Sequence, residues 1–106
     1  MMGDNRIETI SEKLFFELIN LFRLSLTNNR IEEIKDKAFE HCVQFRFLDL
    51  SVNKIKTLTK FTLYRLNQLE ELNLHDNNIQ YIEKGALQSL HHLQQCDLSI
   101  RLKLEL

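Results

Sequence analysis

The residues that most often perform chemistry are few in this chain of 106 residues, which has four histidines and two cysteines. His75, Asp49 and Asp97 form the one set whose positions could bring a histidine and carboxylates together. A zinc site needs three or four ligands that converge, and no fourth candidate accompanies these three. The adjacent pair His91 and His92 is expected to point its two side chains apart. The sequence therefore predicts no metal site and no cofactor.

Catalytic motifs are also missing from the sequence. It contains no glycine-rich phosphate loop, no HExxH zinc-protease motif and no GxSxG nucleophile motif. Its 14 basic and 15 acidic residues give a formal net charge of −1, so nucleic acid and anionic membranes gain no electrostatic attraction. No stretch of about 18 apolar residues could span a bilayer. We therefore expect a protein that is not an enzyme, does not bind nucleic acid and has no membrane span.

An internal repeat of 24 residues runs through the chain and determines where the side chains lie. Asparagine recurs at positions 5, 29, 53 and 77, and isoleucine follows each asparagine two residues later. Further apolar columns recur with the same period: Leu21, Phe45, Leu69 and Leu93; Leu24, Leu48, Leu72 and Cys96; Leu26, Leu50, Leu74 and Leu98; Phe15, Phe39, Leu63 and Leu87; and Leu18, Cys42, Leu66 and Leu90.

Read as LxxLxLxxNxIxxIxxxxFxxL, these columns resemble the leucine-rich-repeat family. The resemblance covers residues 5 to about 98, and the repeat length is similar to that of the subtype common in extracellular receptors and matrix proteins. It implies an α/β solenoid, which is a right-handed coil with a parallel sheet on its concave face and short helical, 3₁₀ or irregular returns on its convex face. The chain lacks the cysteine-rich caps, repeat prolines, sequons and secretion signal of that subtype, so its localisation stays unknown.

The residues themselves favour the same architecture. The leucine triplets at 24–26, 48–50 and 72–74 alternate with the period of a strand that buries one face. Such strands can stack in parallel about 4.8 Å apart. An inward asparagine at each turn can hydrogen-bond the backbone of neighbouring coils. Such bonds can stabilise the turns that Gly and Pro usually form, and this chain has only two Gly and no Pro. Apolar spacing in the returns, for example 35–43 and 59–67, predicts a short helical or 3₁₀ turn.

The repeat divides this single domain into a partial N-terminal repeat (1–20), three full repeats (21–92) and a degenerate C-terminal strand or partial repeat (93–106). Arg101 and Lys103 stand where the pattern requires Asn and Ile, and apolar residues alternate from Cys96 onward. Neither end has an evident polar cap, although the terminal coils of repeat proteins need one. The alternative prediction is therefore a structural or assembly unit whose exposed ends stack on another copy and form a homo-oligomer.

Both cysteines occupy apolar columns of the repeat. Cys42 shares the column of Leu18, Leu66 and Leu90, and Cys96 that of Leu24, Leu48 and Leu72. Cysteine is a small apolar residue that is often buried, and these two lie on different walls of the predicted coil. We therefore expect two core thiols and no disulfide.

The outward strand residues indicate where function would reside, because the concave face of a solenoid usually carries binding. Stacked repeats would align small polar and acidic residues there, and Phe47 lies close to two arginines. Aromatic residues and arginine are common anchors of protein interfaces, although Phe47 could instead pack sideways. The predicted protein-partner contacts are Arg23, Ser25, Arg46, Phe47, Asp49, Glu71, Asn73, His75 and Asp97. We interpret the chain as a protein-recognition module, a fragment or isoform of a larger receptor-like or adhesion-like protein.

Overall fold

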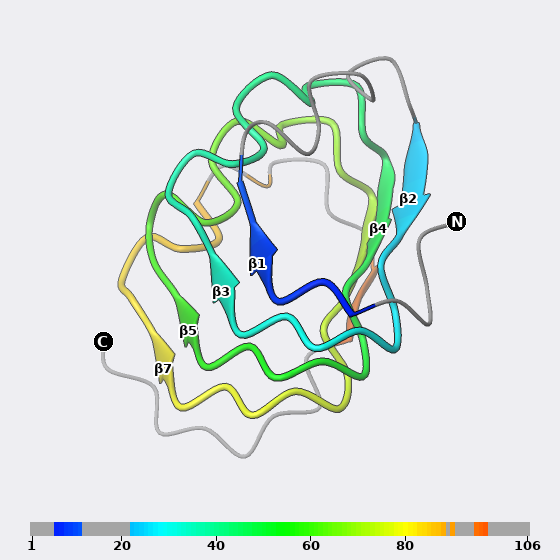
Figure 1. The fold of residues 1–106 in the computed structure, drawn as a ribbon. Coiled ribbons are helices and arrows are strands. Elements are labelled where there is room, and N and C mark those ends of the chain that lie inside the picture. The colour runs from blue at the N-terminus through cyan, green and yellow to red at the C-terminus, as the bar shows by residue number, and fades with distance from the viewer. Residues whose placement is uncertain (1–5, 12–21, 89, 91–94, 98–106) are drawn as a thin grey trace.

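The computed structural model describes residues 6–11, 22–88, 90 and 95–97, with 95–97 described by their backbone alone (Figure 1). The chain winds in successive coils, and each full coil places one strand on either side of the molecule (Figure 1). The predicted partial repeat at 1–20 lies mostly outside the described residues. The alternating tail predicted from Cys96 onward lies outside them beyond residue 97, including Arg101 and Lys103.

One side of the coil is a four-stranded parallel sheet with the order β2-β4-β6-β8. Its strands are β2 (Arg23–Ser25), β4 (Phe47–Asp49), β6 (Glu71–Asn73) and β8 (Gln95–Asp97). The register pairs Leu24 with Leu48, Leu48 with Leu72 and Leu72 with Cys96, which is one repeat per strand. The parallel sheet predicted from the leucine triplets is therefore confirmed.

The opposite side carries shorter parallel strands, which the sequence analysis did not predict. They are β1 (Thr9–Ile10), β3 (Glu33–Ile34), β5 (Thr57–Leu58) and β7 (Tyr81–Ile82). β1 pairs with β3 and β5 with β7, so the ladder is interrupted between the second and third coils. Each strand buries its second residue and exposes its first.

A buried threonine diverts one backbone donor at the interruption between β3 and β5. In the neighbouring coils, Lys35 and Glu83 each donate a backbone N–H to the preceding coil at 2.8 Å. The equivalent Thr59 N–H donates instead to Thr62 Oγ1, also at 2.8 Å. Thr62 is 1% exposed and its hydroxyl needs a partner, so it competes with the ladder for this donor.

The return segments take the irregular form of the predicted architecture. Their backbone hydrogen bonds are separate i→i−3 turns, such as Cys42 N to Phe39 O at 2.9 Å. No helix forms in the part of the chain that the structure describes, so the helical or 3₁₀ turns expected at 35–43 and 59–67 are absent there. Lys37 and Arg65 have φ values of 63° and 71°, and these left-handed residues interrupt the repeated torsions that a helix needs. No described helix is long and apolar enough to cross a membrane.

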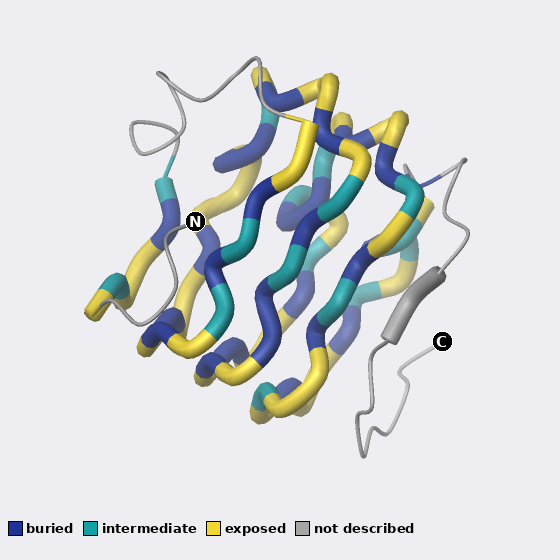
Figure 2. Tube along the Cα trace, turned by 90° about the vertical axis from the view of Figure 1, so that its right-hand side faces the viewer, coloured by how far each residue is buried: buried dark blue, intermediate teal, exposed yellow. Residues whose placement is uncertain are grey.

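Leucine and isoleucine side chains from both strand sets meet inside the coil with two phenylalanines. Figure 2 looks onto the four-stranded sheet and shows buried positions alternating with more exposed ones along its strands. Cys42 is 1% exposed, which confirms its predicted core position, and burial raises the pKa of its thiol to about 11. The Cys96 side chain is outside the description.

Inward asparagines tie adjacent coils together, as the sequence predicts. Asn53 is 8% exposed, and its amide donates to the carbonyls of Leu26, Leu50 and Ser51 at 3.0–3.1 Å. Its Oδ1 accepts the Ile31 N–H at 3.1 Å. Since each such asparagine contacts its own coil and the one before, the ladder fixes the spacing of the sheet that carries the candidate site.

The residue before each of these asparagines adopts a left-handed conformation. Asn28, Val52 and Asp76 have φ values of 58°, 54° and 56°. Asn and Asp tolerate this region, whereas a β-branched residue is strained there. The chain therefore makes the same turn in these three described coils without glycine, at an energetic cost in the coil that contains Val52.

Candidate functional site

A hollow of about 440 Å³ lies on the outward side of β2, β4 and β6. Leu24, Leu48 and Leu72 line it together with six of the predicted contact residues: Arg23, Ser25, Phe47, Asp49, Glu71 and Asn73. These residues come together because the register aligns the first and third positions of the three strands. The sheet thus gathers side chains that are one or two full repeats apart in sequence.

Two arginine–phenylalanine pairs cross from β2 to β4. The Arg23 Cζ lies 4.5 Å from the centroid of the Phe47 ring, and the Arg46 Cζ lies 5.7 Å from that of Phe22. Both distances are within the range of cation–π attraction. Phe22 is 56% exposed, so this edge presents an aromatic ring directly to solvent.

Phe22 was not among the predicted contacts, although its position contained the signal. It immediately precedes β2 and stands one repeat before Arg46, so the same stacking rule that pairs Arg23 with Phe47 pairs these two. The sequence already places Phe22 on the outward face, directly before Arg23 and the first leucine triplet. The strand begins at Arg23, and Phe22 is therefore exposed at its margin.

Polar side chains at the strand ends are held by local hydrogen bonds. Asp49 Oδ1 accepts from the Ser51 backbone N–H at 2.9 Å and from its hydroxyl at 2.6 Å. Asn73 Oδ1 accepts from the His75 N–H at 2.9 Å. These bonds fix the orientation of the Asp49 carboxylate and the Asn73 amide beside the hollow, so both groups are ordered before any partner arrives.

The remaining predicted contacts lie at the margin of the hollow. Arg46 precedes β4, and its Nε is 3.8 Å from the Glu70 carboxylate. His75 is exposed beyond β6, where its Nε2 lies 3.3 Å from the Asp76 carboxylate. Asp97 pairs by its backbone with Asn73, and its side chain is outside the description. Among the described residues, no group of three His, Cys, Asp or Glu side chains could hold a metal ion.

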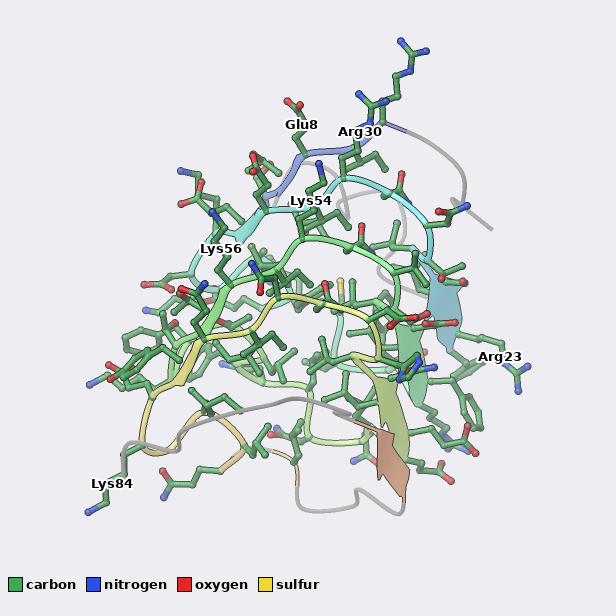
Figure 3. All side chains as sticks on the ribbon, turned by 90° about the horizontal axis from the view of Figure 1, so that it is seen from below. Glu8, Arg23, Arg30, Lys54, Lys56 and Lys84 are labelled. Atoms are coloured by element: carbon green, nitrogen blue, oxygen red, sulfur yellow. The ribbon has the colours of Figure 1, made fainter. Side chains whose placement is uncertain are left out.

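Charge is distributed unevenly along this face. Arg23 on β2 and Arg46 before β4 supply positive charge, whereas Asp49 on β4, Glu70 before β6 and Glu71 on β6 supply negative charge. Figure 3 shows Arg23 projecting away from the sheet, on a different side of the molecule from Arg30 and Lys54. The arrangement offers an exposed, ordered surface with aromatic, cationic and anionic groups, which is a composition suited to binding another macromolecule.

Comparisons with known proteins agree with this architecture. The family model for the leucine rich repeat matches residues 1–55 and 46–99, and the chain belongs to the leucine-rich-repeat family. A chain in the solved structure of the Toll–Spatzle complex of Drosophila is similar to it, with a TM-score of 0.89 and 27% sequence identity. That alignment covers 99% of this chain and 14% of the other. Among curated proteins, none matches the sequence.

Proposed function

We propose that this chain is a protein-recognition module that binds its partner through the outward face of β2, β4 and β6. The observation that carries the proposal is the hollow in which Arg23 is stacked on Phe47 between polar residues of three strands. Arginine and aromatic residues dominate the energetics of protein interfaces, especially where they are ordered before binding. The leucine-rich-repeat family and the structural neighbour support a protein-interaction role in general.

The neighbouring structure also supports a role within a longer protein. The similar chain belongs to a complex described as a molecular hub in development and innate immunity. The alignment with our chain covers 14% of that chain. We therefore propose that our chain forms part of a larger receptor-like or adhesion-like protein, and that its face contributes a portion of a wider interface.

A catalytic role has less support than binding. The candidate face is an open strand surface, whereas enzymes stabilise reacting charges in sites that exclude water. Its histidine, His75, lies beside Asp76, and within the described part of the chain no hydrogen bond directs it toward a nucleophile. We propose a binding protein without enzymatic activity.

Charge reversal on the candidate face tests the proposal. A partner isolated with the unchanged chain is purified and titrated against a variant with Asp49→Lys, Glu71→Lys and Asn73→Lys. If the face binds the partner, we expect Kd to rise at least about 30-fold, since losing one interface hot spot costs about 2 kcal/mol. Thermal melting of each variant shows that the fold is retained.

A matched control places the same change of charge elsewhere. Glu8, Glu32 and Gln80 are exposed residues of the coil segments that lead to β1, β3 and β7. Changing these three to lysine alters the net charge equally and should leave Kd within about twofold, because surface charges away from an interface act weakly. Equal weakening by both variants, or unchanged binding by the first, contradicts the proposal.

A further inference from the structure

Three side chains of the candidate face form a straight row with a defined order of charge and polarity. Arg23, Phe47 and Glu71 are register partners on β2, β4 and β6. Adjacent strands are about 4.8 Å apart, so the row runs across the strands with roughly 9.6 Å between its ends. It presents a cation, an aromatic ring and an anion in sequence along the axis of the solenoid.

The cationic end of the row is ready to bind a carboxylate. The Arg23 guanidinium lies over the Phe47 ring, with its Cζ 4.5 Å from the ring centroid, and it carries five N–H donors that can bind a carboxylate. No carboxylate of the described residues forms an ion pair with Arg23. The ring holds the guanidinium in place, so a partner that binds it loses less conformational entropy.

The anionic end is available in the same way. Glu71 is exposed and forms no ion pair within the described part of the chain. Asp49 lies one strand away, with one carboxylate oxygen held by Ser51. A basic group of a partner placed over Glu71 would therefore displace no internal ion pair from it.

The spacing of the row matches one face of an α-helix. Residues i, i+3 and i+7 of a helix share a face and lie at 0, about 4.5 and about 10.5 Å along its axis. The row requires 0, about 4.8 and about 9.6 Å. In an extended chain, side chains on one face recur about every 6.6–6.8 Å, which places no third residue near the end of the row.

The width of the face fits a helix as well. Each strand contains three residues and is about 10 Å long, which is close to the diameter of a helix with its side chains, about 10–12 Å. A helix lying along the row would sit over the hollow of about 440 Å³ that the row lines. Ser25 and Asn73 would border it on the far side and could accept or donate hydrogen bonds.

Resting on the proposed function, we propose that the occupant of this face is an amphipathic α-helix of a partner protein, aligned with the solenoid axis. An acidic residue of that helix binds Arg23, an apolar residue three or four positions later packs on Phe47, and a basic residue at i+7 binds Glu71. The opposite helix direction satisfies the same contacts with the charges in reverse sequence order. The charge complementarity of the row and its helical spacing select this partner chemistry.

A displayed library of alanine-rich helices, randomised at i, i+3, i+4 and i+7, tests the inference on the full chain. A length of about 18 residues allows such sequences to be helical in water. We expect the selected helices to carry an acid and a base at the two ends of this face with apolar residues between them. A synthetic peptide of the selected sequence is then titrated against the chain and its variants by fluorescence anisotropy.

Exchanging the charges distinguishes a direct contact from a change in net charge. Arg23→Glu should weaken the selected peptide about threefold to fivefold, the effect of an exposed ion pair. A peptide with lysine in place of its acid should recover that loss on this variant and bind the unchanged chain more weakly. Arg30→Glu makes the same change of charge on another side of the molecule and should alter Kd by less than about twofold (Figure 3).

The outcomes separate this inference from the proposed function. The helix inference is overturned if no helices are selected, if the selected helices show no charge preference, or if Arg23→Glu leaves their Kd unchanged. A parallel library of short linear peptides provides the second measurement. If linear peptides bind the chain and their binding is lost on Glu71→Lys and Asn73→Lys, while no helix binds, the helix is excluded and the proposed function stands. Binders from both libraries that ignore all of these substitutions would contradict both.

Discussion

Replacing Asn53 with alanine should destabilise the fold, because this side chain joins two coils through four hydrogen bonds. It donates to the carbonyls of Leu26, Leu50 and Ser51 and accepts the Ile31 N–H, and it is 8% exposed. Alanine preserves the backbone and removes all four bonds at once. The substitution therefore isolates the contribution of the asparagine ladder to the spacing of the sheet.

The expected loss follows from what each partner retains. The Leu26 and Leu50 carbonyls still accept from Asn29 and Asn77 at 2.8 and 2.9 Å. The Ile31 N–H has no other partner among the described residues and stays buried, which costs about 1–3 kcal/mol. Adding a smaller contribution from the carbonyls gives a loss of about 3 kcal/mol in the free energy of unfolding.

Urea denaturation followed by far-UV circular dichroism measures this loss, and Asn67→Ala is its control. Asn67 is an exposed residue of a return segment, so the same substitution there should change the free energy of unfolding by less than about 0.5 kcal/mol. A loss below about 1 kcal/mol for Asn53→Ala, or equal losses for both variants, would refute the assignment of inter-coil stability to this ladder.

Three further predictions concern stability and one concerns assembly. Val52→Asn should raise the free energy of unfolding by about 1 kcal/mol in the same assay, because asparagine tolerates the φ of 54°; no gain would show that this turn is unstrained. Thr62→Ala should let β5 pair with β3 and slow amide hydrogen exchange at Thr57, whereas unchanged exchange would mean that Thr62 does not cause the interruption. Burial raises the pKa of the Cys42 thiol from 9.0 to about 11, so the thiol of the unfolded chain loses its proton at lower pH than that of the folded chain. The free energy of unfolding should therefore be constant below pH 9 and fall between pH 9 and 11. Cys42→Ala should remove this fall from the pH profile. Stacking through the ends predicts a mass in light scattering that rises with concentration, and a constant mass would argue against it.

The fold was predictable because its determinants recur in the sequence. Each leucine triplet is matched one repeat later, so strand positions, direction and register all follow from one period, as the pairing of Leu24 with Leu48 shows. The same arithmetic places Arg23 beside Phe47 and Asp49 beside Asn73. These contacts can be predicted from the sequence because residues one repeat apart lie side by side on adjacent coils of a solenoid.

Features that differ between repeats were not predictable in this way. At the β3–β5 interruption, the hydroxyl of a single threonine captures one backbone donor. The returns contain left-handed residues such as Lys37 and Arg65, which the apolar spacing alone did not reveal. Local competition for hydrogen bonds and backbone torsions decided each case.

Hydroxyl-radical footprinting of the chain, free and bound to its purified partner, tests the central claim most directly. The method reports the solvent exposure of aromatic side chains, and the chain offers rings on different sides. Phe22 and Phe47 border the candidate face, whereas the exposed Tyr81 belongs to β7 on the other side. Protection of Phe22 and Phe47 with unchanged oxidation of Tyr81 is the predicted result, and protection of Tyr81 with unchanged Phe22 and Phe47 would contradict it.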